Sequence, residues 1–361
     1  MTDSPAFSHV HIIGTGLLGT SIGMAISGHG GAVSLEDLSP ARASLAAEYG
    51  AGTTEAASAL IELVVVATPP DVTASVVQSA LERFPDAVVI DVASIKAPIV
   101  DAVASGGHER FLGTHPMAGR EKGGPTQARS DLFVGRPWVV CPTPGTPSDL
   151  LGRVEDLIRL LGATVYRMDA GEHDHAVAVV SHLPQVVSSA LSATLDSAPD
   201  QALELAGQGL RDMTRIAASD AELWSQILQH NAPAVRAELA ALRARLEKFD
   251  RALEQASEQG VRRELAEQLE AGVAGVARIP GKHGRSDRFT TITVVIDDRP
   301  GQLASLLTDV GELGVNLEDM GLEHSPGAPV GFVSLSVLPS VAAGLVSDLV
   351  DRGWRVAGET S

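Results

Sequence analysis

Short apolar runs alternate with helix-length segments through the first half of the chain. They cover residues 9–13, 32–36, 63–67, 88–92, 111–114 and 138–140. Runs of this length that are rich in Val and Ile are typical of buried strands, and helices between them favour a parallel sheet covered on both faces. The pattern therefore predicts an α/β domain with a parallel sheet over residues 1–170.

A glycine or a polar residue stands at the end of five of these predicted strands. The five residues are Gly14, Asp37, Thr68, Ser94 and His115. Because ligands of parallel α/β sheets bind at the carboxyl ends of the strands, we expect the functional site along this edge of the sheet.

The first predicted strand leads into Gly14-x-Gly16-x-x-Gly19 and then into an apolar segment that fits a helix. Glycines at this spacing permit a tight turn and the close approach of a pyrophosphate, which then lies at the helix N-terminus. The motif predicts a Rossmann-type dinucleotide-binding domain. The expected cofactor contacts are Gly14, Gly16, Leu17, Leu18, Gly19, Asp37, Thr68 and Pro69.

An acidic residue after the second predicted strand bears on the choice of cofactor. Asp37, 18 residues after Gly19, is expected to accept hydrogen bonds from the adenosine ribose and to repel a 2′-phosphate. Alternatively, Asp37 is only a turn residue and Glu36 takes this role. Either acid favours NAD over NADP, although Arg42 nearby leaves the strictness of that preference open.

The charge of the chain narrows the choice of partners. A net charge of −18 at pH 7 argues against nucleic acid and anionic membranes. An anionic substrate would therefore need a local cluster of Arg, Lys or His.

The single cysteine, Cys141, excludes an intrachain disulfide and a multi-cysteine zinc site, and we expect it to be a small buried hydrophobe. The sequence has no signal-peptide pattern, and no uninterrupted apolar run reaches the ~18–20 residues of a membrane span. We therefore expect a cytoplasmic protein with no membrane partner.

Residues 171–272 have a helical pattern. Leu239, Leu242, Leu246, Phe249 and Leu253 are spaced 3, 4, 3 and 4 residues apart, which gives an apolar seam that needs a partner helix. Packing within the chain and a subunit interface both fit this seam, and we expect a homodimer through the helical domain.

A Gly-rich stretch over residues 273–288 is interpreted as a linker, and a third unit follows over residues 289–361. Its predicted elements follow the order β-α-β-β-α-β, which is typical of a ferredoxin-like α+β domain.

His115 stands in a loop rich in Gly and Pro, with Glu121 and Lys122 close behind it. A neutral imidazole accepts a proton near pH 7. Oxidation of an alcohol by hydride transfer needs such a group, because the hydroxyl proton must leave with the hydride. We therefore interpret His115 as the catalytic base. The alternative is a structural histidine before Pro116.

Three other side chains are candidates for the same site. Ser94 is expected to hydrogen-bond the substrate and the histidine, or to cap a helix over residues 95–104. Arg211 and Arg215 are four residues apart, which on a helix places them on one side. Such a pair suits a carboxylate, whereas the alternative is a solvated or salt-bridged face. Trp224 is assigned to the substrate site, although a lone tryptophan is more often in the core.

Polar residues interrupt an apolar helical run at Ser181-His182-Leu-Pro184-Gln185. Proline inside a helix is costly, so we expect special local geometry, with His182 and Gln185 toward the substrate. The preceding His173, Asp174 and His175 do not share one helical face, and hydride transfer to NAD needs no metal. We therefore predict no metal site.

In combination, these motifs resemble the prephenate dehydrogenase (TyrA) family. The matching stretches are Gly14-x-Gly16-Leu-Leu-Gly19-x-Ser21, Asp91-Val-Ala-Ser94-x-Lys96, His115-Pro-Met-Ala-Gly-x-Glu121-Lys122-x-Gly124, His173-Asp174, Ser181-His182-Leu-Pro184, and Arg211-Asp-x-Thr-Arg215-Ile-Ala with Trp224. The resemblance covers roughly residues 9–250, and residues 289–357 resemble an ACT domain, a module that usually binds an amino acid.

The resemblance implies NAD-dependent oxidative decarboxylation of prephenate to 4-hydroxyphenylpyruvate, in L-tyrosine biosynthesis. By the same resemblance, His115 accepts a hydrogen bond from the substrate hydroxyl, and Ser94 assists it. Arg215 is implied to bind a substrate carboxylate, and Glu121 to lie near the site entrance. Aromatisation drives the reaction, so the protein chiefly positions groups and takes one proton.

One position departs from the family pattern. Where many relatives have a second histidine that contacts substrate, this chain has Gln185, whose neutral amide supplies no positive charge. Arogenate therefore stays open as the alternative substrate, and we favour prephenate.

In the ACT-like unit, the turns with Asp298, Gly301 and Asn316 are expected to present backbone groups to an amino-acid effector. L-Tyrosine is the first hypothesis, and subunit pairing alone is the alternative. Two other functions are alternatives for the whole chain. The first is a β-hydroxyacid dehydrogenase, but that class typically uses a lysine base, and the His115 loop and Ser94 argue against it. The second is a non-catalytic NAD or amino-acid sensor, which would not need His115.

Overall fold

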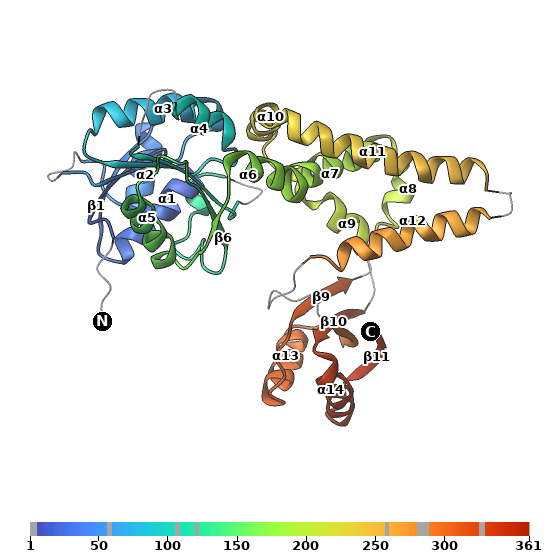
Figure 1. Ribbon diagram of the computed structural model, residues 1–361. Coiled ribbons are helices and arrows are strands. Elements are labelled where there is room, and N and C mark those ends of the chain that lie inside the picture. Colours follow the sequence, from blue (N-terminus) through green and yellow to red (C-terminus); the bar gives the residue numbers. More distant parts are fainter. Residues whose placement is uncertain are drawn as a thin grey trace. The chain divides into compact units, whose positions relative to one another are not determined.

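The computed structural model describes residues 6–55, 60–104, 109–119, 123–256, 260–279, 289–324 and 329–360. The chain forms two compact units (Figure 1). The first contains residues 1–196 and 214–242, and the second contains residues 197–213 and 243–361.

A seven-stranded sheet is the frame of the first unit. Its strands are β1 (His9–Ile13), β2 (Ala32–Glu36), β3 (Leu63–Val66), β4 (Val88–Asp91), β5 (Phe111–Pro116), β6 (Pro137–Cys141) and β7 (Thr164–Arg167), in the order β2-β1-β3-β4-β5-β6-β7. Strands β1 to β5 are parallel, as the sequence pattern predicts. Their carboxyl ends therefore meet along one edge.

The last two strands correct that prediction. Strand β6 pairs antiparallel with β5, and β7 pairs parallel with β6, so the sheet is mixed. A parallel neighbour of β5 would need a long crossover, usually a helix. Among the described residues between β5 and β6, the only helical element is the 3₁₀ turn η1 (Pro125–Gln127). The short, mostly exposed β7 was not predicted at all.

Helices cover both faces of the sheet (Figure 1). They are α1 (Leu17–Gly28), α2 (Pro40–Glu48), α3 (Pro70–Arg83), α4 (Ala97–Ala104) and α5 (Ser148–Leu160). Two apolar clusters separate these faces, one with α1, α2 and α5 and the other with α3 and α4. Cys141 is buried in β6, and burial raises the pKa of its thiol to about 12, which confirms it as a small core residue.

The glycine-rich loop between β1 and α1 is closely packed. Gly14 has φ +100°, which favours glycine, and a Cβ on it would lie 2.4 Å from the Ala67 carbonyl oxygen. A Cβ on Gly19 would lie 1.9 Å from the Gly14 oxygen, whereas one on Gly16 would have no neighbour within 4 Å. The loop thus holds two glycines against the protein and leaves space above the third.

Helices complete the first unit after the sheet. They are α6 (Ala170–Val177), the π-helical turn η2 (Ala178–His182), α7 (Leu183–Thr194), the 3₁₀ turn η4 (Arg215–Ala218), α10 (Ala221–His230) and the start of α11 (Ala232–Glu254). Pro184 stands in the first turn of α7. The special geometry expected there is confirmed, because the π turn directly precedes α7.

Within the described part of the chain, the run Ala170–Ser197 is the one helix long and apolar enough, by length and composition alone, to cross a bilayer. It also carries the buried polar side chains of His173, Asp174 and His182, which hydrogen-bond within the first unit. This bonding is that of an internal helix of a folded domain.

The second unit contains η3 (Leu195–Ser197) in part, α8 (Asp200–Leu203), α9 (Gln208–Thr214), the end of α11, α12 (Val261–Val276) and a four-stranded antiparallel sheet. The strands are β8 (Thr290–Asp297), β9 (Asp319–His324), β10 (Val330–Val337) and β11 (Arg355–Thr360), in the order β11-β8-β10-β9. Helices α13 (Gln302–Glu312) and α14 (Pro339–Asp351) pack on one face. The elements follow the order β-α-β-β-α-β along the chain.

The predicted apolar seam lies on α11. Two of its members, Leu246 and Leu253, are 56% and 59% exposed. Leu269, Val273 and Val276 on α12 are also exposed. The described residues of one copy of the chain therefore leave much of this apolar surface uncovered.

The glycine loop generates a paired test. We expect Gly19→Ala to lower the free energy of unfolding by ~2 kcal/mol, because its Cβ would overlap a backbone oxygen that cannot move freely. Gly16→Ala should cost less, under ~1 kcal/mol, because its Cβ enters open space and only the N-cap preference for glycine over alanine is lost. Urea unfolding of both variants checks this, and equal losses would contradict the packing described for the loop.

Candidate active site

His115 lies at the carboxyl end of β5 and is 8% exposed. Its strand is tied to β4 through Thr114. The Thr114 hydroxyl donates to the Asp91 carbonyl over 2.6 Å and accepts from the Trp138 indole over 3.0 Å. These buried bonds fix the position from which the imidazole projects.

A buried ion pair stabilises the turn after β4. Asp91 and Lys96 are both fully buried, and the Lys96 ammonium donates to the Asp91 carboxylate. Burial raises the pKa of Asp91, and the nearby ammonium partly offsets that shift. The Asp91 carboxylate also accepts the Ala93 and Thr114 N–H groups, so one side chain connects the ends of β4 and β5.

Two further buried residues form a chain of hydrogen bonds with His115. Nδ1 of His115 lies 2.9 Å from Nε2 of His173, and Nδ1 of His173 lies 2.8 Å from Oδ1 of Asp174. The two imidazole rings meet edge to face at 77°. The sequence analysis weighed His173 and Asp174 as metal ligands and counted them among the family motifs, but it did not predict this arrangement.

Asp174 also corrects the expected capping of α4. The helix begins at Ala97, three residues after Ser94, so Ser94 is not its cap. The Asp174 carboxylate instead accepts the N–H groups of Lys96 and Ala97 over 2.7 and 2.8 Å. Ser94 itself is half-buried in the turn at the same sheet edge as His115.

Burial gives His115 unusual acid–base properties. Desolvation lowers the pKa of its imidazole well below the usual value, and the nearby Lys96 ammonium lowers it further. The ring is therefore neutral near pH 7, which is the state that a proton acceptor needs.

His182 lies in the π turn and is almost fully buried. Its Nδ1 is 3.1 Å from Nδ2 of Asn231, and its ring meets Trp224 edge to face at 5.9 Å. Burial lowers the pKa of His182 to about 4. Asn231, which also donates to the Asp174 carbonyl, was not anticipated from the sequence.

The other predicted substrate residues are placed unevenly. Gln185 on α7 is buried and donates to the Ser189 hydroxyl over 3.3 Å. Arg215 is exposed on η4, an element packed against α7. Arg211 belongs to α9 in the second unit. The expected single helix with both arginines on one face is therefore wrong, because α9 ends at Thr214 and a 3₁₀ turn follows. Glu121 and Lys122 lie outside the described residues.

The expected dinucleotide site surrounds the glycine loop at the same sheet edge. Asp37 accepts the Thr15 N–H over 2.8 Å and the Thr15 hydroxyl over 2.9 Å. Glu36 instead pairs with Arg83 over 2.6 Å and with His11 over 3.1 Å. Asp37 thus lies at the loop, while Glu36 is held by other side chains. Thr68 and Pro69 follow β3, the strand next to β1 in the sheet, and lead into α3.

These residues fit a dinucleotide. The space above Gly16 is open to a pyrophosphate at the N-terminus of α1, and the Asp37 carboxylate keeps lone pairs for ribose hydroxyls. Among the described residues, no group of three or more His, Cys, Asp or Glu side chains is arranged to hold a metal ion.

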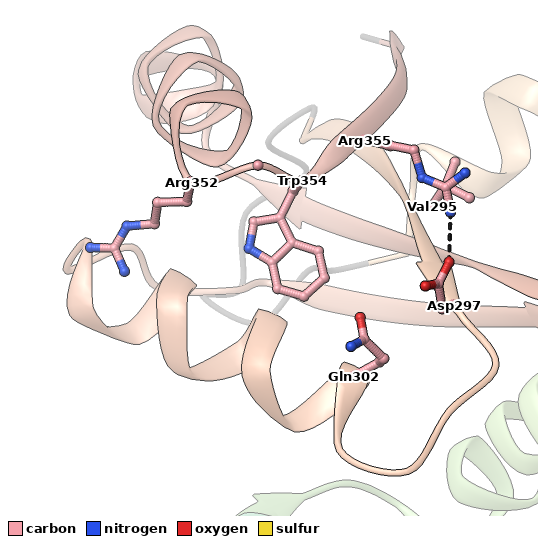
Figure 2. A pocket seen from close by; sticks show the side chains of 7 residues that line it. Val295, Asp297, Gln302, Arg352, Trp354 and Arg355 are labelled. Carbon is pink, nitrogen blue, oxygen red and sulfur yellow. Dashed lines mark hydrogen bonds and ion pairs between the residues drawn. The ribbon is translucent and has the colours of Figure 1, made fainter.

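The predicted effector residues lie on the surface of the second unit. Gly301, with φ +91°, is the N-cap directly before α13. Asp298 is exposed, and the Asn316 amide lies 3.5 Å from Glu318. A cavity of about 270 Å³ lies beside this turn but is lined by other residues (Figure 2). They are Val295, Asp297, Gln302, Arg352, Gly353, Trp354 and Arg355.

Comparison with known proteins relates this geometry to a family. Residues 22–167 match the nucleotide-binding domain of prephenate dehydrogenase, and residues 169–270 match its dimerization domain. A probable prephenate dehydrogenase of Streptomyces niveus, NovF, is 35% identical over 95% of this chain and 98% of its own length. The chain belongs to the prephenate dehydrogenase family.

Other relatives support the same family assignment. A cyclohexadienyl dehydrogenase of Zymomonas mobilis is 29% identical over 63% of this chain and 83% of its own length. The prephenate dehydrogenase of Aquifex aeolicus, solved with hydroxyphenyl propionate and NAD⁺, has a TM-score of 0.66 and 27% identity over 74% of this chain and 98% of its own. An arogenate dehydrogenase of Synechocystis has a TM-score of 0.62 and 26% identity over 74% of this chain and 99% of its own.

The protein is thus an NAD-dependent oxidoreductase with a Rossmann-like domain followed by a helical domain. The family match favours an enzyme of the prephenate dehydrogenase family over the two alternatives, a β-hydroxyacid dehydrogenase and a non-catalytic sensor.

The lowered pKa values of His115 and His182 predict that acid weakens the fold. At a pH just below the usual histidine pKa of about 6.5, both rings are still neutral in the folded protein but become protonated in the unfolded chain. The unfolded chain therefore binds more protons, so the free energy of unfolding falls as the pH drops below about 6.5. The loss should reach up to about 1.4 kcal/mol per pH unit for each histidine.

Chemical unfolding from about pH 7 to about pH 5 measures this slope. His182→Gln should reduce it. His175→Gln, on the exposed side of α6, should leave it unchanged. The account is contradicted if all three proteins lose stability at the same rate.

Proposed function

We propose that this enzyme oxidatively decarboxylates prephenate to 4-hydroxyphenylpyruvate with NAD, as a step of L-tyrosine biosynthesis. The observation that carries the proposal is the buried, neutral imidazole of His115 at the same sheet edge as the glycine loop. The prephenate and cyclohexadienyl dehydrogenases among its relatives support this substrate class.

The chemistry requires few groups from the protein. Bound NAD⁺ supplies the acceptor for the hydride that leaves the ring carbon bearing the hydroxyl. Nε2 of His115 would take the hydroxyl proton as the hydride leaves. The ring carboxylate is then lost as carbon dioxide, and the electrons of the broken carbon–carbon bond make the ring aromatic as a phenolate. The phenolate oxygen takes the proton back from His115, so the product is the phenol and the imidazole is neutral again. Because aromatisation drives the reaction, the role of the protein is to fix the imidazole and orient the substrate.

Substrate recognition is assigned to residues around α7. Arg215 on η4 is the proposed carboxylate ligand, and Ser94 assists His115 from the β4–α4 turn. His182, Gln185 and Trp224 line the helical side. Gln185 brings no charge to this side, so arogenate dehydrogenation is the second candidate. Glu121, Lys122 and Arg211 stay predicted substrate contacts.

We also assign a homodimer to the helical domain. The exposed apolar residues of α11 and α12 support it, as does the match of residues 169–270 to a dimerization domain. A cytoplasmic location stays a prediction from the sequence.

The C-terminal unit is proposed to be an ACT domain that binds an amino-acid effector, with L-tyrosine as the first candidate. Its cavity carries opposite charges close together, with Arg355 2.9 Å from Asp297. An amino acid has an ammonium for Asp297 and a carboxylate for Arg355, and the Trp354 indole lies alongside (Figure 2). This cavity is a better candidate than the turns with Asp298 and Asn316, neither of which lines it.

The first test is activity. Pure protein with NAD and prephenate should produce NADH, and a parallel assay with arogenate measures the preference. His115→Asn should lower kcat by ~10²–10⁴-fold, because an amide cannot accept the proton, with little change in NAD affinity. No NADH from either substrate would overturn the proposal.

The second test concerns the effector. Calorimetry should detect L-tyrosine binding, and Asp297→Asn should weaken it by at least ~10-fold, because the partner of the ammonium is removed. Arg299→Gln, an exposed residue of the neighbouring turn that does not line the cavity, is the matched control. Equal binding by all three proteins would exclude this cavity as the site.

A further inference from the structure

His173 has no role in the chemistry described above, yet it is fully buried in direct contact with the proposed base. Its Nε2 lies 2.9 Å from Nδ1 of His115, and its own Nδ1 lies 2.8 Å from Oδ1 of Asp174. It therefore separates the proposed base from a buried carboxylate.

The hydrogen bonds around Asp174 indicate which nitrogen carries each proton. The carboxylate accepts N–H groups from Lys96 and Ala97 over 2.7 and 2.8 Å, which is the bonding of an ionised acid. An ionised carboxylate only accepts, so Nδ1 of His173 must donate to it. A neutral His173 then carries no proton on Nε2.

The second ring follows from the first. Because Nε2 of His173 is an acceptor, Nδ1 of His115 must donate to it. Neutral imidazole carries one proton, so Nε2 of His115 is left bare. That is the nitrogen a substrate hydroxyl needs as its proton acceptor.

We propose that His173 is a positioning residue that holds His115 in the tautomer with its proton on Nδ1 and presents a bare Nε2 to the substrate hydroxyl. Asp174 fixes the tautomer of His173, and His173 fixes that of His115. The catalytic part of the inference rests on the proposed function, whereas the tautomer is a property of the free protein.

The arrangement explains why two histidines are used. Asp174 is already bound to the start of α4 through its two backbone hydrogen bonds. The His173 ring connects this carboxylate to His115 on β5. A base in the wrong tautomer would lower the rate, because Nε2–H on His115 would donate to the substrate hydroxyl and could not accept its proton.

The tautomer can be read directly by ¹⁵N NMR of protein labelled at histidine, with the His115 signals assigned from the His115→Asn spectrum. Near pH 7, Nδ1 of His115 should be protonated and Nε2 bare. His173→Leu replaces the imidazole by an apolar side chain of moderate size. In this variant we expect His115 to become a mixture of two tautomers, one with the proton on Nδ1 and one with the proton on Nε2. This measurement needs no substrate, so it stands even if neither prephenate nor arogenate is turned over.

Kinetics separates positioning from a merely structural role. His173→Leu should lower kcat about 100-fold, with the KM for NAD changed less than about threefold. His173→Gln should restore kcat to within about tenfold of the parent enzyme, because its amide oxygen can accept the Nδ1 proton of His115. His175→Leu on the same helix is the matched control and should behave like the parent.

Circular dichroism and thermal unfolding establish that each variant is folded. Several results would overturn the proposal: Nε2 of His115 protonated in the parent protein, an unchanged tautomer in folded His173→Leu, a kcat within about threefold of the parent in that variant, or a folded His173→Gln that fails to recover activity.

Discussion

The Asp174 carboxylate is the constraint on which the arrangement of this site depends. It is one buried side chain on α6, yet it holds the first N–H groups of α4 and the ring of His173. Through His173 it also fixes His115 on β5, although His115 and His173 are 58 residues apart in the sequence. A buried acceptor with three donors is costly to break, because each donor would lose its partner without gaining water.

The second buried carboxylate, Asp91, works in parallel at the other end of the turn. It binds Lys96 and the backbone of β5, so the β4–α4 turn is fixed at both ends. The consequence is a rigid, dry site at the sheet edge, where the pKa of a histidine is lowered by burial and by neighbouring positive charge. The π turn before α7 adds His182 to the same buried group.

The sequence predicts most features that depend on local pattern. Strand ends, the glycine spacing and the proline in α7 each leave a signal within a few residues, and His115 could be singled out from them. The features it missed depend on long-range contact. Nothing near His173 indicates that its ring will meet β5, and the direction of β6 depends on how a loop returns. The single helix expected to carry Arg211 and Arg215 is wrong, because α9 ends at Thr214 and a 3₁₀ turn begins at Arg215.

The central claim is that His115 faces the hydroxyl of the reacting ring. A crystal structure of this protein with NAD⁺ and a phenolic product analogue tests it most directly. The account predicts the phenol oxygen at ~2.6–3.2 Å from Nε2 of His115, with Nδ1 still bonded to His173. A phenol bound elsewhere, or an imidazole turned away from the nicotinamide, would contradict it.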